Sequence, residues 1–354
     1  MATNAAARPT RWLAAFQVGF TYIGTIVGAG FASGQEIFHF VTRYGNKSIF
    51  IILVSVLLFT LAGAQIMLLA RRIRASSYHQ FNEYVFGKKA GLWVNAFTLL
   101  TLLCTTGVML AGSGALFAQQ WGGFYQTGIV GTALLVYLIT SRGMDAIMSI
   151  NMLVVPIMLG FTILIGAYTF AENGFYVPPS STPSPAGWTL SPFLYVAFNL
   201  SLALAVLVPL GNEVQDRGTL ISGSIIGGVG LGILLLLSNY ALLTYKNDIA
   251  QAEVPMAMIV ASLGPFIQWA FSLVILGEIF TTLVGNVFGL TRQLQLFAPF
   301  ASHPRLLIIG LLMVCYVISQ FGFSTLVHHL YPLFGYLGAG TMLMIFLAHY
   351  KTAS

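Results

Sequence analysis

The sequence predicts an all-α integral membrane protein. Hydrophobic residues make up 57% of the 354 residues and charged residues only 7%, whereas soluble domains carry about 25% charged residues. So few charges cannot cover a water-facing surface. The chain also contains apolar runs of the length that a helix needs to cross the hydrocarbon, about 20 residues. These runs are too uniformly apolar for the strands of a membrane barrel, in which apolar and polar residues alternate.

Ten apolar runs are long enough to be membrane spans, and the loops between them are short. Residues 1–354 are therefore expected to form a single transmembrane domain. The weakest boundary separates the last two runs, where residues 320–323 give the only turn signal, so nine or eleven spans are alternatives. The ten candidate spans are residues 12–42, 48–70, 91–120, 125–141, 146–171, 192–213, 219–244, 265–291, 306–322 and 324–349.

The positions of Lys and Arg predict the orientation, because short cytoplasmic loops are enriched in both. With both termini in the cytoplasm, three basic residues fall outside, Arg43, Lys47 and Lys246, and twelve fall inside. The net charge of +6 is therefore a topology signal. It does not indicate a nucleic-acid partner, because no soluble basic domain is present. The inner residues are Arg8, Arg11, Arg71, Arg72, Arg74, Lys88, Lys89, Arg142, Arg217, Arg292, Arg305 and Lys351.

The first span contains four glycines between residues 24 and 34. Each glycine costs about 1 kcal/mol relative to alanine inside a helix. Ser33-Gly34-Gln35-Glu36 also has the S-x-x-E form of a capping box, which marks a helix start. We therefore expect the helix to be interrupted near Gly28–Gly30 and to restart after Ser33. The alternative is an unbroken helix whose small residues allow close packing.

A helix interrupted at membrane depth must line a cavity or be buried in protein. Its freed N–H groups can bind an anionic group, and its freed carbonyls can bind a cation. This combination is typical of the binding site of a secondary transporter.

Polar features recur half a chain after this glycine cluster. Asn199 and Ser201 lie in span six, about 173–176 residues after the first interruption. The Thr-Thr pairs at residues 105–106 and 281–282 are 176 residues apart. The two offsets agree, and five spans separate the halves. We therefore expect two inverted repeats of five spans, with discontinuous helices one and six. The repeats would cover about residues 12–171 and 192–349.

Residues 27–36, Val-Gly-Ala-Gly-Phe-Ala-Ser-Gly-Gln-Glu, resemble the signature of the YkvI-type bacterial membrane proteins of the LeuT-fold (amino acid–polyamine–organocation) superfamily. Val27–Gly30 is similar to the unwound motif of span one in the neurotransmitter:sodium symporters. Residues 199–203 are similar to their unwound motif in span six, with Ala203 in place of glycine. The resemblance implies the LeuT fold for the ten-span chain and a location in the bacterial cytoplasmic (inner) membrane.

The resemblance also implies a Na+ site between spans one and eight. Its ligands would be the carbonyls of Gly24, Val27 and Glu278 and the hydroxyls of Thr281 and Thr282. Oxygen ligands suit a hard cation. The alternative for the threonines is a hydrogen bond to their own helix. Family members usually have a small residue at the position of Glu278. An ionisable group at this depth is expected to be functional, so Glu278 could join the ion site or carry a proton.

The expected substrate site surrounds the interruptions of spans one and six. The N–H groups of Ala29–Phe31 would bind a substrate carboxylate, and carbonyls of span six would bind its amine. Glu36 either caps the restarted helix or meets the cationic end of the substrate or a proton. The polar residues of spans three and six either line the cavity or hydrogen-bond between helices. The candidate residues are Gly28, Ala29, Gly30, Phe31, Ser33, Glu36, Thr105, Thr106, Phe198, Asn199, Ser201 and Leu202.

These features predict a secondary active transporter that imports a small organic solute together with Na+ by alternating access. The resemblance implies an amino acid or a related zwitterion as the solute. One alternative is coupling to H+ through Glu278 or Glu36, and another is a non-transporting membrane sensor or scaffold. No catalytic or dinucleotide motif indicates an enzyme or an organic cofactor. The expected partners are the solute and membrane lipid.

Two further groups are candidates for gates. Phe31, Tyr195 and Phe198 could close the pocket from outside. Glu213 and Asp216 lie beside Arg217 at the inner end of span six and could form a local ion pair or an inner gate.

Overall fold

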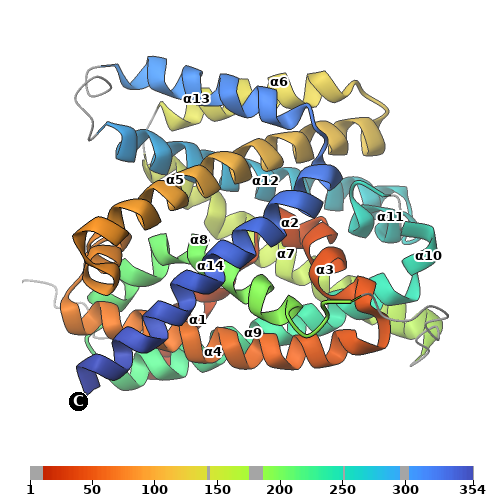
Figure 1. Ribbon diagram of the computed structural model, residues 1–354. Coiled ribbons are helices and arrows are strands. Elements are labelled where there is room, and N and C mark those ends of the chain that lie inside the picture. The colour runs from red at the N-terminus through yellow and green to blue at the C-terminus, as the bar shows by residue number, and fades with distance from the viewer. Residues whose placement is uncertain (1–10, 142–143, 175–185, 250–251, 296–302, 354) are drawn as a thin grey trace, which may run out of the picture.

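The computed structural model describes residues 11–141, 144–174, 186–249, 252–295 and 303–353, and all regular elements in these ranges are helices (Figure 1). Arg8 and Arg142, which contribute to the predicted orientation, lie outside the described residues. The first half contains α1 (Arg11–Ile26), α2 (Ala29–Ala32), α3 (Gln35–Phe40), the short 3₁₀ helix η1 (Thr42–Lys47), α4 (Ser48–Ile73), α5 (Tyr78–Trp121), α6 (Tyr125–Thr140) and α7 (Met144–Asn173). The second half contains α8 (Ser191–Glu213), α9 (Arg217–Thr244), α10 (Lys246–Ile249), α11 (Pro255–Ala261), α12 (Pro265–Leu294), α13 (Pro304–Ser319) and α14 (Phe323–Ala353).

The predicted spans coincide with these helices. Span one corresponds to α1–α3, and span three is the part of α5 after a bend at Gly87 (φ 75°). The other eight spans are α4, α6, α7, α8, α9, α12, α13 and α14. Among the described residues, five helical segments are long and apolar enough to cross a membrane alone, and α13 and α14 together form a sixth candidate bent by 103°. The count of ten spans therefore stays a prediction.

The helix contacts divide most of the fold into two groups of four. In the first group, α9 packs on α1 and α4, and α4 packs on α8. In the second group, α5 packs on α6, α12 and α13. In Figure 1, α4 and α9 lie at one edge of the molecule and α6 and α13 at the opposite edge. Helices α7 and α14 each contact both groups.

The contacts of the first five spans have counterparts among the last five. The α1–α9 contact is matched by α4–α8, the α5–α13 contact by α12–α6, and the α7–α12 contact by α14–α5. This pairing is what two repeats of the same five-span unit produce. It supports the division at about residues 12–171 and 192–349, which remains a proposal.

Glycines allow α9 to approach both of its neighbours in the first group. A β-carbon at Gly223 would lie 2.4 Å from Val18 Cγ1 of α1, and one at Gly232 would lie 2.4 Å from Val56 Cγ2 of α4. Small residues at such interfaces let helix backbones pack closely in a membrane. The position of α1 beside α9 therefore depends on the glycine-rich faces of α9.

Span six is a single helix, so the discontinuity predicted there is wrong. Helix α8 runs without a break from Ser191 to Glu213. Asn199 Nδ2 donates to the carbonyl of Tyr195 at 3.1 Å, and Ser201 Oγ donates to the carbonyl of Ala197 at 2.6 Å. Alanine is the strongest helix former. With alanine instead of glycine at position 203, nothing in this segment favours unwinding.

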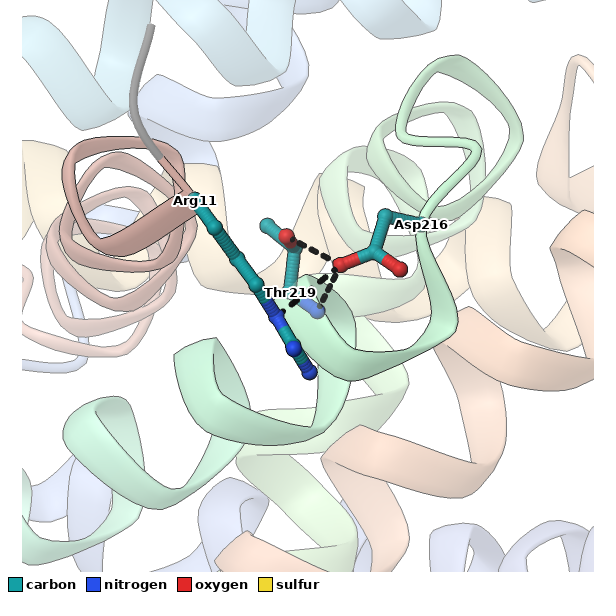
Figure 2. A network of polar contacts seen from close by, with 3 residues as sticks. All are labelled: Arg11, Asp216 and Thr219. Atoms are coloured by element: carbon teal, nitrogen blue, oxygen red, sulfur yellow. Dashed lines mark hydrogen bonds and ion pairs between the residues drawn. The ribbon is translucent and has the colours of Figure 1, made fainter.

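Asp216 links the beginnings of α1 and α9 (Figure 2). Its carboxylate accepts hydrogen bonds from Thr219 N at 2.8 Å and Thr219 Oγ1 at 2.7 Å, so it caps α9. These bonds lower the pKa of Asp216 below its usual value. Arg11 Nε lies 3.4 Å from the same carboxylate. The ion pair of Asp216 is thus formed with Arg11 and not with the adjacent Arg217. Because both side chains are exposed, the pair contributes little to stability.

The close packing of α8 on α4 can be tested at Gly211. A β-carbon at Gly211 would lie 2.4 Å from the backbone oxygen of Met67. A backbone atom cannot move aside as a side chain can. Gly211→Ala should therefore lower the melting temperature of the purified protein, although alanine favours a helix interior by about 1 kcal/mol. Gly285→Ala in α12 is the matched control, because open space surrounds that position. Equal melting temperatures for the two variants would contradict this packing.

Candidate functional site

The first interruption of span one lies between α1 and α2, as the glycine cluster predicts. The last backbone hydrogen bond of α1 runs from Val27 N to Ile23 O at 2.8 Å, and the first of α2 runs from Ala32 N to Gly28 O at 2.9 Å. Among the described residues, no backbone hydrogen bond joins the N–H groups of residues 28–31 to the carbonyls of residues 24–27. The expected freed polar groups are therefore present at this interruption.

A second interruption separates α2 from α3. Gly34 has a positive φ of 83°, a conformation that glycine adopts without strain. Ser33 Oγ donates to the carbonyl of Gly30 at 3.0 Å. The carbonyl of Ser33 accepts a bond from Met256 N at 3.0 Å, which ties α11 to this interruption. The start of α3 is thus held by the Ser33 hydrogen bond within the turn and by the hydrogen bond from Met256 of α11.

The capping box predicted for Ser33 and Glu36 is not formed. Ser33 Oγ accepts a bond from Gln35 N at 3.3 Å, and the Glu36 side chain turns toward α8. Asn199 Nδ2 donates to Glu36 Oε1 at 2.8 Å. Asn199 thus supplies the hydrogen-bond donor that the buried carboxyl needs. Glu36 therefore links the two spans that the sequence identifies as the site.

The Glu36 carboxyl lies against the first interruption. A β-carbon at Gly30 would be 2.7 Å from Glu36 Oε2 and 3.2 Å from the hydroxyl of Tyr331 in α14. Glu36 is only 4% exposed and Asn199 only 5%. Tyr195 is also buried near this carboxyl. Groups from α2, α3, α8 and α14 thus meet around one carboxyl.

Several buried aromatic rings pack against one another near this carboxyl. The rings of Phe198 and Tyr331 have centroids 4.3 Å apart. Phe40 lies 5.4 Å from the ring of Tyr195 and is stacked at 6.4 Å on Phe198. Phe31 is buried as well. A carboxylate near aromatic rings is suited to an organic cation, because both the charge and the ring quadrupoles attract it.

The predicted Na+ ligands of α12 lie beside the first interruption. Thr282 Oγ1 is 3.6 Å from the position of a β-carbon at Gly28. Thr281 and Thr282 donate to the carbonyl of Glu278 at 3.1 and 2.8 Å. Both hydroxyls therefore bond within their own helix, but each keeps lone pairs for a cation. The carbonyl of Glu278 already accepts both threonines, so it is a weaker candidate ligand than the sequence suggests.

The Glu278 side chain offers another oxygen. Glu278 is 2% exposed, and its Oε1 has no hydrogen-bond partner among the described residues. It lies one turn from Thr281 and Thr282 on the same helix face. The carbonyls of Gly24 and Val27 likewise accept no backbone hydrogen bond among the described residues. Two carbonyls, two hydroxyls and a carboxyl are oxygen groups of the kind that suits a hard cation such as Na+.

Several other candidates are not joined to this site by the described hydrogen bonds. Thr105 and Thr106 bond within α5, to the carbonyls of Thr101 and Leu102. Ser201 faces α14, where a β-carbon at Gly338 would lie 2.7 Å from its hydroxyl. Leu202 is half-buried in the core. Asn199 is therefore the one polar candidate of α8 that contacts Glu36.

The sequence did not identify Tyr331 and Phe40 as parts of the site. Tyr331 lies in span ten, and Phe40 lies one turn after Glu36. Neither stands in a glycine-rich or polar motif. Only the packing of α14 and α3 on α8 brings them to the carboxyl.

Comparisons with known proteins identify two relatives. No known protein-family model matches the chain. The chain is 40% identical to the uncharacterized membrane protein YkvI of Bacillus subtilis (strain 168) over 325 residues, which are 91% of this chain and 92% of that protein. It is 24% identical to the uncharacterized protein YyaD of the same organism over 95% of this chain and 97% of that protein.

Solved transporter structures share the fold. The inward-facing conformation of Mhp1 matches 93% of this chain and 75% of its own, with a TM-score of 0.71 and 11% identity. The substrate-bound, outward-open state of a Na+-coupled sialic acid symporter matches 94% of this chain and 78% of its own, with a TM-score of 0.67 and 12% identity. Both are transporters and not enzymes. At such low identity the likeness shows the fold, which is the LeuT fold of an integral membrane protein. The 40% sequence identity between this chain and YkvI, over most of both chains, shows that the protein belongs to the YkvI family of membrane proteins.

Proposed function

We propose that the protein is a secondary active transporter that moves a small amino-group-bearing solute by alternating access. The fold supports this proposal, because Mhp1 is described as a nucleobase-cation-symport-1 family transporter and the sialic acid symporter as Na+-coupled. The division into two helix groups supports it too. Spans one, six and ten meet where these groups contact each other, so a movement of one group against the other acts on the site.

The observation that carries the proposed substrate class is the Glu36–Asn199 pair at the first interruption. A substrate ammonium group has three donors, and Glu36 is a buried acceptor near aromatic rings. Carbonyls of α8 are less suitable for the amine, because they belong to an unbroken helix. The N–H groups of Ala29–Phe31 are available for a carboxylate. An amino acid or related zwitterion fits both groups, because its amine can bind Glu36 and its carboxylate can bind these N–H groups.

We further propose that Na+ is the coupling ion, held by Thr281 and Thr282 together with the carbonyls of Gly24 and Val27. The Glu278 carboxyl would complete the site, because its Oε1 has no partner among the described residues. The same observation favours a second candidate, in which Glu278 carries a proton across the membrane instead. Import, the inner-membrane location and cytoplasmic termini are part of the same proposal.

The proposed role of Glu36 is tested by Glu36→Gln. The purified protein should be stabilised against heat by some members of a panel of amino acids, amines and organic acids, and the amino-bearing members should act through Glu36. Glutamine keeps the size and hydrogen bonding but removes the charge that binds an ammonium group. Stabilisation by amines and amino acids should therefore be lost. Glu213→Gln, the same change at an exposed position of α8, is the control. Stabilisation that survives in Glu36→Gln would contradict the assignment.

The proposed Na+ site is tested by Thr281→Ala combined with Thr282→Ala. Removal of two hydroxyl ligands should raise the Na+ concentration for half-maximal uptake into proteoliposomes by about tenfold or more. Thr291→Ala is the matched control, because Thr291 is buried in the same helix and bonds its own backbone at 2.7 Å. Uptake that is independent of Na+ but driven by a pH gradient, and lost in Glu278→Gln, would overturn the Na+ proposal in favour of H+. The absence of uptake of any stabilising ligand would support a sensor or scaffold instead.

A further inference from the structure

A pocket of about 200 Å³ lies between α3, α11 and the start of α14. These segments share the face that the basic residues predict to be outside. The polar side chains that line the pocket are Gln35, His39, Arg43, Ser324 and His328. All of them can donate hydrogen bonds, and no described carboxylate lines the pocket. Its size suits a solute smaller than a typical drug-sized ligand.

Arg43 is the principal charge in this pocket. Its Nη2 donates to the hydroxyl of Tyr44 at 2.8 Å, and its Nη1 lies 3.4 Å from His39 Nδ1. Its Nε is buried without a hydrogen-bond partner among the described residues. The one ion pair found among those residues joins Arg11 to Asp216 and not Arg43 to an acid. An arginine without a carboxylate partner beside a cavity is suited to bind an oxyanion through two parallel hydrogen bonds.

Two further basic residues lie near Arg43, although neither of them lines the pocket. Lys246 Nζ donates to the carbonyl of Arg43 at 3.2 Å, and Lys47 follows Arg43 after a kink at Gly45. These are the three basic residues that the topology places outside. His328 packs edge-on against His39, with ring centroids 4.8 Å apart. Positive side chains around a low-dielectric pocket attract anionic ligands.

Among the described residues, neither a metal site nor an ion pair with an acid explains why Arg43, His39 and His328 lie together. The described residues contain no group of three or more His, Cys, Asp or Glu side chains that could hold a metal ion. The carboxylate of Glu253 accepts a hydrogen bond from Ser324 N at 2.7 Å, and Glu253 does not line the pocket. Among the described residues, no carboxylate pairs with Arg43.

We propose that this pocket is a carboxylate-binding site at the outer mouth of the protein. Arg43 binds the carboxylate, and His39 and His328 supply flanking donors. If His39 Nδ1 accepts from Arg43, its Nε2 carries a proton and is a donor. The identification of this carboxylate as that of the transported solute rests on the proposed transport function, whereas carboxylate binding itself does not. On that basis the outer pocket selects solutes that carry a carboxylate before they reach Glu36.

The test uses two probes on the full-length purified protein, propionate for the outer pocket and ethylammonium for Glu36, each against an equal concentration of sodium chloride. Propionate should raise the melting temperature of the wild type. Arg43→Gln should weaken the apparent affinity for propionate about tenfold or more, because it removes charge-assisted hydrogen bonds. Lys47→Gln removes the same charge from a side chain that lies over the Trp188 ring, and it should have a much smaller effect. Arg43→Lys should restore part of the affinity.

Glu36→Gln and Arg43→Gln distinguish the proposed central site from the proposed outer site. Glu36→Gln should keep the response to propionate and lose that to ethylammonium, and Arg43→Gln should do the reverse. A wild type that does not respond to propionate, or equal losses in Arg43→Gln and Lys47→Gln, would overturn the outer site while leaving the proposal for Glu36 intact. If Arg43→Gln does not fold, His328→Ala replaces it, with a smaller loss of propionate affinity expected and an unchanged affinity refuting the site.

Discussion

The hydrogen bond from Asn199 to the Glu36 carboxyl is the interaction on which the central site depends. A carboxyl buried in the membrane interior is costly unless a partner compensates it. Asn199 supplies that partner from α8, and the bond of 2.8 Å holds the restarted part of span one against span six. The same carboxyl lies beside the freed backbone groups of the first interruption. Its position therefore determines which groups can bind at the broken helix.

The rest of the fold places this interaction where the two helix groups meet. Helix α1 packs on α9 in the first group, whereas α2 contacts α12 and α5 in the second. The interruption between α1 and α2 thus joins segments that belong to different groups. If the groups move relative to each other, as in alternating access, the strain falls on Val27 and Gly28, which are outside any regular helix. The α1–α2 interruption is therefore the place in the chain where the proposed alternating-access movement would bend the backbone.

The sequence predicted most of the fold because the signals were local. Apolar runs located the helices, and glycines near residue 28 located the interruption of span one. The interruption expected in span six rested on similarity to a motif, and Ala203 was the local sign that the helix continues. Glu36 and Asn199 were both identified, but their pairing joins residues 163 positions apart and depends on how α3 packs on α8. Tyr331 was missed for the same reason. The sequence placed Arg43, Lys47 and Lys246 on the outer side but did not group them around a pocket, since no local pattern joins Lys246 to Arg43.

The most direct test of the central claim is infrared difference spectroscopy of the carboxyl groups when an amino-bearing ligand binds. If Glu36 contacts the ammonium group, a stabilising amine or amino acid should shift a carboxyl band of the wild-type protein. The shift should be absent in Glu36→Gln and retained in Glu213→Gln. A band that does not respond to the ligand, or a shift that persists in Glu36→Gln, would contradict the account.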